Sequence, residues 1–262
     1  MQIQSLNIFS SSLISNISFS STKRNNLCKK QYSNDYFEKN NFISPQLPKR
    51  VYENARDVVM QSLFDKNPKE SIVLIREGEI LFHSIGNEFE AEIPDEVMDD
   101  ILDSGDGSIT IVHSHTSEST GLTAPLSLTD IGNLIDNNEI NCICAVNNKG
   151  EYSIIEKIPG RKYNEATSEL IDNKFCAGFV KLFKGSKRKE YLNFLKFINE
   201  NSTQKENETY DDFIERMFTI QDKLDEYYDY ATTLKGFPNY TEDFWKNNAK
   251  DFGFRYYSNF SF

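Results

Sequence analysis

Two of the three histidines in this 262-residue chain, His113 and His115, are separated by a single residue in the segment IVHSH. In a β-strand, side chains two residues apart point to the same face with their Cα atoms roughly 7 Å apart, so the two imidazoles can converge on one cation. Zinc accepts nitrogen and oxygen ligands, and catalytic zinc sites combine three protein ligands with an open position for water. The histidine pair therefore predicts two of the three ligands of a zinc centre.

Asp130, fifteen residues after His115, is the candidate for the third ligand. It lies at the front of a helix expected from residue 127 to about residue 137, and the loop before this helix can bring it back over the end of the strand. A water molecule in the open position needs a base that takes its proton during attack. Glu70, which directly precedes the strand-like run SIVLI, is the candidate for this base.

The same residues also have non-catalytic interpretations. Ser127 to Asp130, SLTD, has the form of a capping box, in which the serine caps the helix and the acid three residues later reaches back. A cap accounts for Ser127 and Asp130 without any metal, but it accounts for neither histidine of the pair. His83 is expected to be an ordinary surface or core residue, and Glu70 has several acidic neighbours in the sequence.

The elements that must position these residues follow from the apolar spacing. The expected order is a helix over 51–63, a hairpin that turns at Glu77-Gly78, a short helix in PDEVMDDIL, the strand SITIVHSH, the helix from Ser127, and two strands around a turn at 147–150. The alternation of strand and helix predicts a compact α/β layer of about 110 residues. Cys142 and Cys144 are expected to be small core residues of this layer.

Residues 165 to 252 carry helical patterns that are rich in Phe and Tyr. Between Tyr210 and Leu234, two apolar series repeat every seven residues, a spacing that makes a seam for a partner helix. The helix that carries this seam is expected to begin at Thr209, which can cap it together with Asp212, and to end at Gly236 and Pro238. Packing within the chain, against the helix expected at 191–198, is the commoner outcome, and helix-mediated self-association through 210–234 is the alternative.

Composition limits the partners and the setting. The net charge of −11 speaks against direct binding of nucleic acid, which needs a basic face to meet phosphates. No apolar segment approaches the ~20 residues of a membrane span, so no membrane association is expected. The four cysteines show no spacing typical of a disulfide framework or a thiolate zinc site. We therefore expect an intracellular, cytoplasmic setting.

Glu70, His113-Ser114-His115 and Ser127-Leu-Thr-Asp130, in this order and spacing, resemble the signature of the JAB/MPN metalloprotease family, also called JAMM. That signature is a glutamate at the start of the first strand, H-[ST]-H-P, a short loop, and S-x-x-D opening a helix. The resemblance covers about residues 49–158. It implies an α/β fold, a JAB/MPN-like mixed β-sheet flanked by helices, which here is followed by an aromatic-rich α-helical C-terminal region.

The resemblance also implies roles for the individual residues. His113, His115 and Asp130 would bind Zn²⁺. Glu70 would hold and deprotonate the zinc-bound water, and Ser127 would donate a hydrogen bond to the oxyanion. The substrate would be an isopeptide or peptide bond after the tail of a ubiquitin-like protein, with the tail lying along a strand edge.

The sequence departs from the family's pattern at two places. Thr116 stands where the family has proline, and the loop from His115 to Ser127 is about four residues longer than usual, an insertion that loops tolerate cheaply. The expected organisation is a poorly ordered Ser/Asn-rich segment at 1–45, a JAB/MPN-like metalloprotease domain at 46–160, and a mostly helical region at 161–262. The alternatives to a protease are a non-catalytic MPN scaffold or interaction module, and a JAB domain associated with phage, toxin or DNA-repair proteins.

Overall fold

A computed structural model describes residues 49–64, 66–87, 91–102, 109–116, 125–148 and 150–259. The expectation for the segment 1–45 lies outside these residues. Most of the loop between His115 and Ser127 lies outside them as well.

The described strands form one mixed sheet of six strands in the order β2-β1-β3-β4-β5-β6. They are β1 (Ser71–Arg76), β2 (Glu79–Ile85), β3 (Ile109–His115), β4 (Ile140–Asn147), β5 (Tyr152–Lys157) and β6 (Phe254–Ser258). The two central strands, β3 and β4, are parallel, and every other neighbouring pair is antiparallel. The strand that carries the two histidines therefore lies inside the sheet, between β1 and β4.

The described helices are α1 (Lys49–Leu63), α2 (Asp95–Leu102), α3 (Leu128–Asp136), α4 (Glu165–Ala177), the short 3-10 helix η3 (Gly178–Lys181), α5 (Gly185–Asn201), α6 (Tyr210–Thr232) and α7 (Phe237–Phe252). The order of elements from α1 to β5 is the predicted one, which confirms the α/β layer. In the part of the chain that the structure describes, no helix is both long and apolar enough to cross a bilayer.

Both predicted hairpin turns are present. Glu77 and Gly78 have φ angles of 49° and 93°, and a two-residue turn with positive φ at both positions matches the right-handed twist of the strands on either side. Gly150 also has a positive φ, and its N–H donates to the carbonyl oxygen of Asn147 at 3.0 Å. These turns set the registers of β1 with β2 and of β4 with β5.

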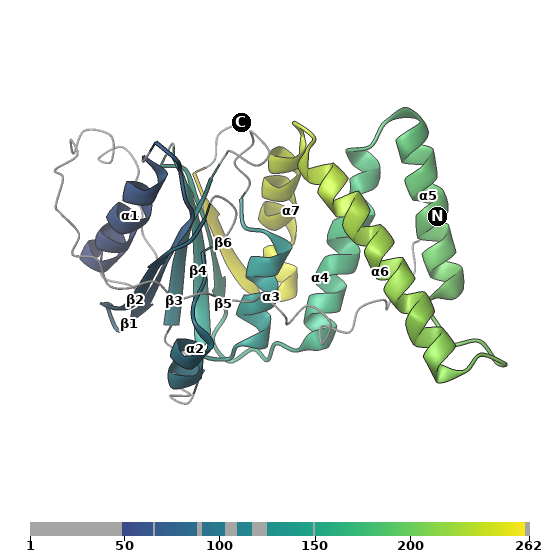
Figure 1. Cartoon of the computed structure of the whole chain (residues 1–262), viewed down its shortest axis with the longest axis horizontal. Coiled ribbons are helices and arrows are strands. Elements are labelled where there is room, and N and C mark those ends of the chain that lie inside the picture. Colours follow the sequence, from purple (N-terminus) through teal and green to yellow (C-terminus); the bar gives the residue numbers. More distant parts are fainter. Residues whose placement is uncertain are drawn as a thin grey trace.

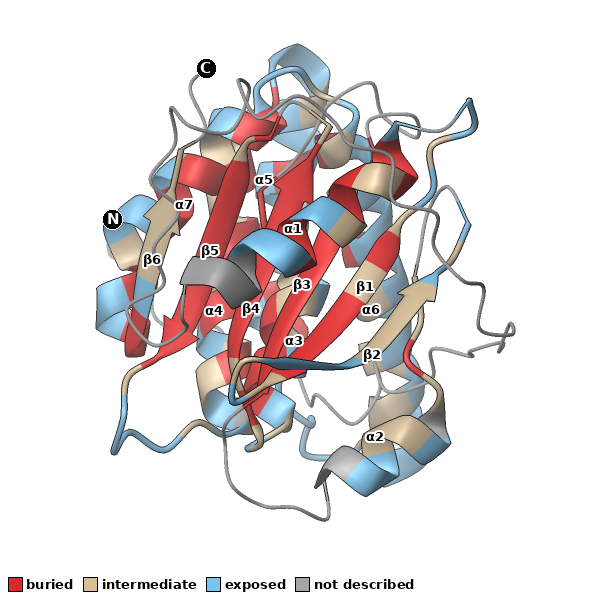
Figure 2. Cartoon of the chain, turned by 90° about the vertical axis from the view of Figure 1, so that its left-hand side faces the viewer, coloured by how far each residue is buried: buried red, intermediate tan, exposed pale blue. Residues whose placement is uncertain are grey.

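The two faces of the sheet are covered differently (Figures 1 and 2). One face packs against α1 and buries Cys142 and Cys144, which are core residues as predicted. The other face packs against α3 and the later helices in a larger cluster. Members of that cluster include Ile111, Ile143 and Ile155 of the sheet, Ile131 and Leu134 of α3, and Phe175, Tyr227, Trp245 and Phe252 of the later helices. The boundary expected near residue 160 does not interrupt this core.

The seam on α6 packs within the chain against α5, as predicted. Tyr227 contacts the rings of Tyr191 and Phe194 with centroids 4.7 Å and 5.1 Å apart, and its hydroxyl donates to Glu190 at 3.1 Å. The predicted N-cap is also confirmed, because the Thr209 side chain accepts the N–H of Asp212.

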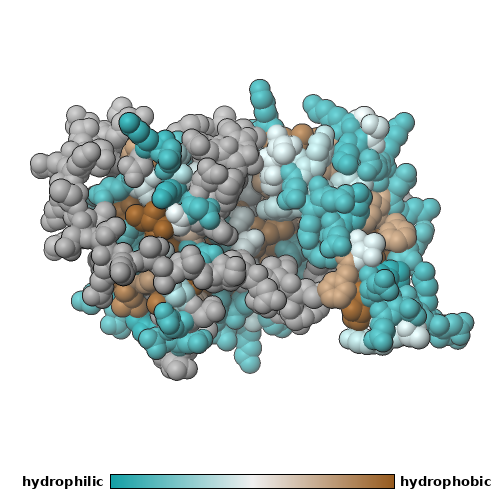
Figure 3. All heavy atoms as spheres, viewed as in Figure 1, coloured by the Kyte–Doolittle hydropathy of each residue, from teal (hydrophilic) through white to brown (hydrophobic). Residues whose placement is uncertain are grey.

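The surface of the helical end is mostly hydrophilic, with separate apolar side chains among the polar ones (Figure 3). The exposed large apolar residues of α4 to α6 are Leu170, Leu192, Phe197, Tyr210, Phe218 and Tyr230. Self-association through α6 remains a prediction.

One strand was not expected from the sequence. After α7 the chain turns through Gly253, which has a φ of 93°, and β6 pairs with β5 at the edge of the sheet. A five-residue run that follows a long helical pattern carries little periodicity of its own. Its identity as a strand therefore depends on the partner that it meets in three dimensions.

Candidate metal centre

β3 places His113 and His115 on the face of the sheet opposite α1. The neighbours of His113 along the strand, Val112 and Ser114, point toward α1, because successive side chains alternate between the two faces. His113 is buried, and His115 lies half-buried at the end of the strand. Asp130 reaches them from the first turn of α3, which packs on the same face.

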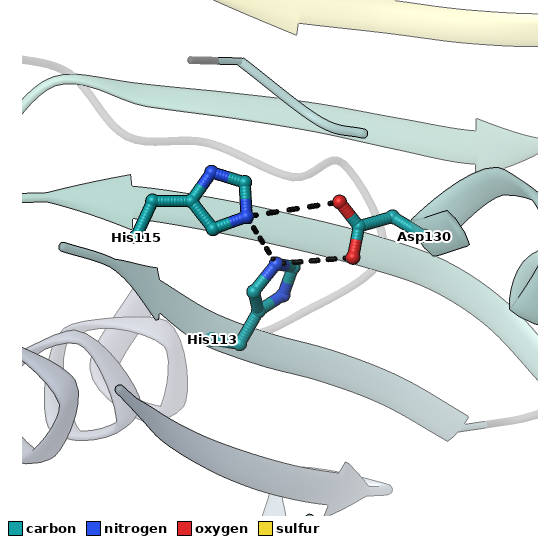
Figure 4. Close-up of side chains that lie close together, drawn as sticks. All are labelled: His113, His115 and Asp130. Carbon is teal, nitrogen blue, oxygen red and sulfur yellow. Dashed lines mark hydrogen bonds and ion pairs between the residues drawn. The ribbon is translucent and has the colours of Figure 1, made fainter. Parts of the chain in front are cut away.

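The ligand atoms of these three side chains point toward one another (Figure 4). The two Nε2 atoms of His113 and His115 are 2.9 Å apart. Asp130 divides its oxygens between them, with Oδ1 lying 3.1 Å from Nε2 of His113 and Oδ2 lying 3.7 Å from Nε2 of His115.

These spacings fit a shared cation. Two donor atoms that both lie ~2.0–2.1 Å from one ion in tetrahedral geometry are about 3.3 Å apart. The three measured separations fall on both sides of this value, and the ligand atoms all lie within 4.8 Å of one another. Among the residues that the structure describes, His113, His115 and Asp130 thus form a group that could hold a metal ion.

The electrostatics of Asp130 suit a ligand. Burial alone raises the pKa of this carboxyl, because it removes water from the charged form. The charge and hydrogen bond of His113, with smaller effects of His115 and the Ser127 hydroxyl, outweigh burial and hold the pKa of Asp130 well below its usual range. The carboxylate is therefore ionised at neutral pH, which is the form that binds a metal.

The predicted capping box is present at the start of α3 and coexists with the metal geometry. The Ser127 hydroxyl oxygen accepts the N–H of Asp130 at 3.2 Å, and the N–H and hydroxyl of Ser127 donate to Oδ2 of Asp130 at 2.6 Å and 2.8 Å. Oδ1 of Asp130 remains directed at His113. The cap thus holds the carboxylate in the orientation that a ligand needs, and it engages the Ser127 hydroxyl.

The serine between the two histidines anchors the strand on the opposite face. Ser114 Oγ accepts the N–H of Ser71 at 2.8 Å, and the hydroxyls of Ser71 and Ser62 share a hydrogen bond of 2.9 Å. The Ser62 hydroxyl also lies 2.8 Å from the carbonyl oxygen of Val59 in α1. This buried chain joins α1, β1 and β3, and the sequence analysis did not predict it. Because side chains along a strand alternate between the two faces, the sequence could have predicted that Ser114 lies on the face opposite the two histidines.

Glu70 lies directly before β1. Its N–H donates to the carbonyl oxygen of Asn87 at 2.7 Å. In the antiparallel pair of β1 and β3, Ile72 lies opposite His113, and continuing this register by two residues brings Glu70 opposite His115 on the face of both imidazoles. Glu70 is not one of the three residues in the ligand group.

β5 holds α3 at both ends. The N–H of Leu126, directly before the cap, donates to Ser153 Oγ at 3.1 Å, and Lys157 Nζ donates to the carbonyl oxygen of Asn137 at 2.7 Å. Burial lowers the pKa of Lys157 to about 8, against two acidic neighbours that raise it. Sequence reasoning found neither contact, because the partners are 27 and 20 residues apart and meet only in the folded sheet.

The structure also places Thr116 and His83, which the sequence analysis considered. Thr116, which follows His115 in place of the family's proline, is buried. His83 lies on β2, away from the pair on β3, and burial lowers the pKa of its imidazole.

A comparison with protein-family models and one with curated proteins found no match to this chain.

Proposed function

We propose that this chain is a zinc-dependent metalloprotease or isopeptidase of the JAB/MPN type. The observation that carries the proposal is the convergence of His113, His115 and Asp130 from a central strand and the first turn of a helix. The register that brings Glu70 to the same face supports it further. Two imidazoles and one carboxylate are a donor set found in catalytic zinc sites.

Zinc bound by these residues would lower the pKa of a water molecule and polarise the scissile carbonyl. The carboxylate of Glu70 takes the proton of the attacking water and delivers it to the leaving amine. The Ser127 hydroxyl donates to the carbonyl oxygen as negative charge develops on it. Because this hydroxyl donates to Oδ2 of Asp130, it must rotate toward the substrate to act.

The substrate class we propose is the extended tail of a ubiquitin-like protein. β2 is an outer strand of the sheet, and its Ile80, Leu81 and Ile85 are 42%, 46% and 45% exposed. An outer strand can pair its backbone with an extended peptide, while exposed apolar side chains beside it give the peptide a surface to contact. Both features support recognition of a tail at this edge.

Glu70→Gln tests the mechanism. The variant keeps the three ligands, so we expect zinc content equal to that of the wild type, while cleavage of a ubiquitin-like fusion protein falls by about 10²–10⁴-fold with the loss of the base. Glu200→Gln, an exposed acid on α5, is the matched control and keeps full activity. Unchanged cleavage by Glu70→Gln contradicts the mechanism. A wild-type protein that binds no zinc contradicts the function.

A further inference from the structure

The segment that carries Glu70 is held by three consecutive backbone N–H groups, each bonded to a different part of the fold. The N–H of Lys69 donates to a carbonyl oxygen of α1 at 3.3 Å, and that of Glu70 donates to the carbonyl oxygen of Asn87, just after β2, at 2.7 Å. The N–H of Ser71 donates to the hydroxyl oxygen of Ser114 at 2.8 Å. Of these three bonds, only the one to Ser114 reaches β3, the strand that carries both histidines.

The backbone pairing of β1 with β3 ends just before this segment. Its last pair on this side is Ile72 with His113, whereas β4 pairs with β3 as far as His115. The backbone of β4 thus holds both histidines in place. The Ser114 hydroxyl continues the link between β1 and β3 by one residue, toward Glu70.

The surroundings of Ser114 keep its hydroxyl in this position. Ser114 and Ser71 are both fully buried, and the Ser71 hydroxyl is bonded in turn to that of Ser62 in α1 at 2.9 Å. A buried N–H that loses its acceptor has no water to replace it, so the bond between Ser71 and Ser114 is favoured strongly in the folded chain. The Ser114 side chain lies on the α1 face of the sheet, so it does not touch the ligand atoms of the metal centre.

We propose that Ser114 is a positioning residue of the candidate centre, which fixes Glu70 relative to His113 and His115. The inference rests on the proposed function, because Glu70 is the base of that reaction. A general base must lie within hydrogen-bond reach, roughly 2.6–3.2 Å, of the proton that it takes, and a misplacement of about 1 Å can slow a reaction 10²-fold. Ser114 acts on this proton transfer through the backbone of β1, without contacting the substrate or the metal.

Ser114→Ala tests the proposal, because it removes the hydroxyl that accepts the Ser71 N–H and leaves Glu70 and the three ligands unchanged. The matched control is Ser62→Ala, which removes a buried hydroxyl at the α1 end of the same series of hydrogen bonds. It leaves the bond between Ser71 and Ser114 in place. Three properties are measured: zinc affinity by competition with a chelator, kcat and KM for a ubiquitin-like fusion protein, and hydrogen exchange of the Ser71 amide in the metal-free protein.

We expect Ser114→Ala to bind zinc like the wild type, because β4 still holds both histidines, while its kcat falls about ten-fold at unchanged KM. The Ser71 amide should exchange faster in this variant. Ser62→Ala should keep the wild-type kcat and the wild-type exchange of Ser71. A purely structural role of the hydroxyls would leave kcat unchanged in both variants.

Three results overturn the proposal: wild-type kcat in Ser114→Ala, an equal fall of kcat in both variants, or a loss of zinc affinity in Ser114→Ala. The last result would mean that the hydroxyl holds the ligands rather than the base. If the wild-type protein neither binds zinc nor cleaves the fusion protein, the proposed function fails separately. The Ser71 exchange then decides alone: faster exchange in Ser114→Ala only supports Ser114 as the group that fixes the start of β1 to β3, and unchanged exchange overturns it.

Discussion

At the scale of single residues, Asp130 combines two roles that the sequence presents as alternatives. One carboxylate oxygen accepts the capping hydrogen bonds of Ser127, and the other faces His113. The histidine pair could be predicted because strand periodicity alone puts both imidazoles on one face. The hydrogen bond from the Leu126 N–H to Ser153 could not, since the two residues are 27 positions apart in the chain and meet only in the folded sheet.

Replacing Asp130 separates its two roles when a second helix serves as the control. The start of α6 has the corresponding pair of side-chain hydrogen bonds, with the Thr209 hydroxyl donating to Asp212 at 2.6 Å and accepting its N–H at 3.2 Å. Asp130→Ala and Asp212→Ala should each lower the free energy of unfolding of the metal-free protein by about 0.5–1 kcal/mol, measured in urea. Only Asp130→Ala should lose bound metal, measured by elemental analysis after dialysis. Equal metal content in the two variants would show that Asp130 is a cap alone.

At the scale of elements, the contact of α3 with α4 gathers acidic side chains. Asp172 of α4 lies near Asp136 of α3 and near Glu169 in its own helix. Burial, and then these two charges, raises the pKa of Asp172 to about 7. The helical pattern predicted both helices. The packing of α3 against α4 was not predictable, because it depends on the path that the chain takes between β5 and α4.

The raised pKa of Asp172 makes stability depend on pH. The folded chain holds this proton more tightly than the unfolded chain, so the contribution is fully present below pH about 4 and is lost as the pH rises to about 7. Asp172→Asn cannot ionise and should exceed the wild type by of order 1–3 kcal/mol at pH 8, with the difference vanishing near pH 4. Urea unfolding at several pH values measures this. Asp211→Asn, an exposed acid on α6, should follow the wild type. A parallel pH profile for Asp172→Asn and the wild type would refute the effect.

At the scale of the whole molecule, one hydrophobic cluster joins the sheet, α3 and the C-terminal helices. The order of elements up to β5 could be predicted because each element has its own periodicity. The way the C-terminal region returns to the sheet could not, since Phe252 and Phe254 are core residues only by virtue of the sheet and helices that they meet. The candidate site therefore depends on segments from both halves of the chain.

A chain that ends at residue 160 tests this shared core. It lacks the α4 to α7 side chains that cover the α3 face of the sheet, and it lacks the edge partner of β5. We expect it to show no cooperative thermal transition, followed by circular dichroism, while the full chain melts in one step. A sharp transition in the shortened chain would mean that the α/β layer folds alone.

The position of α6 along the chain has a consequence for biosynthesis. His113 and Asp130 leave the ribosome about a hundred residues before Tyr227 of α6, which belongs to the same hydrophobic cluster as Ile131 and Leu134 of α3, a delay on the order of 5–20 s at ordinary elongation rates. During that interval the nascent polypeptide displays metal-binding side chains without the scaffold that shapes their preference. Loading with the correct ion is thus expected to follow translation of α6 rather than to accompany emergence of the ligands.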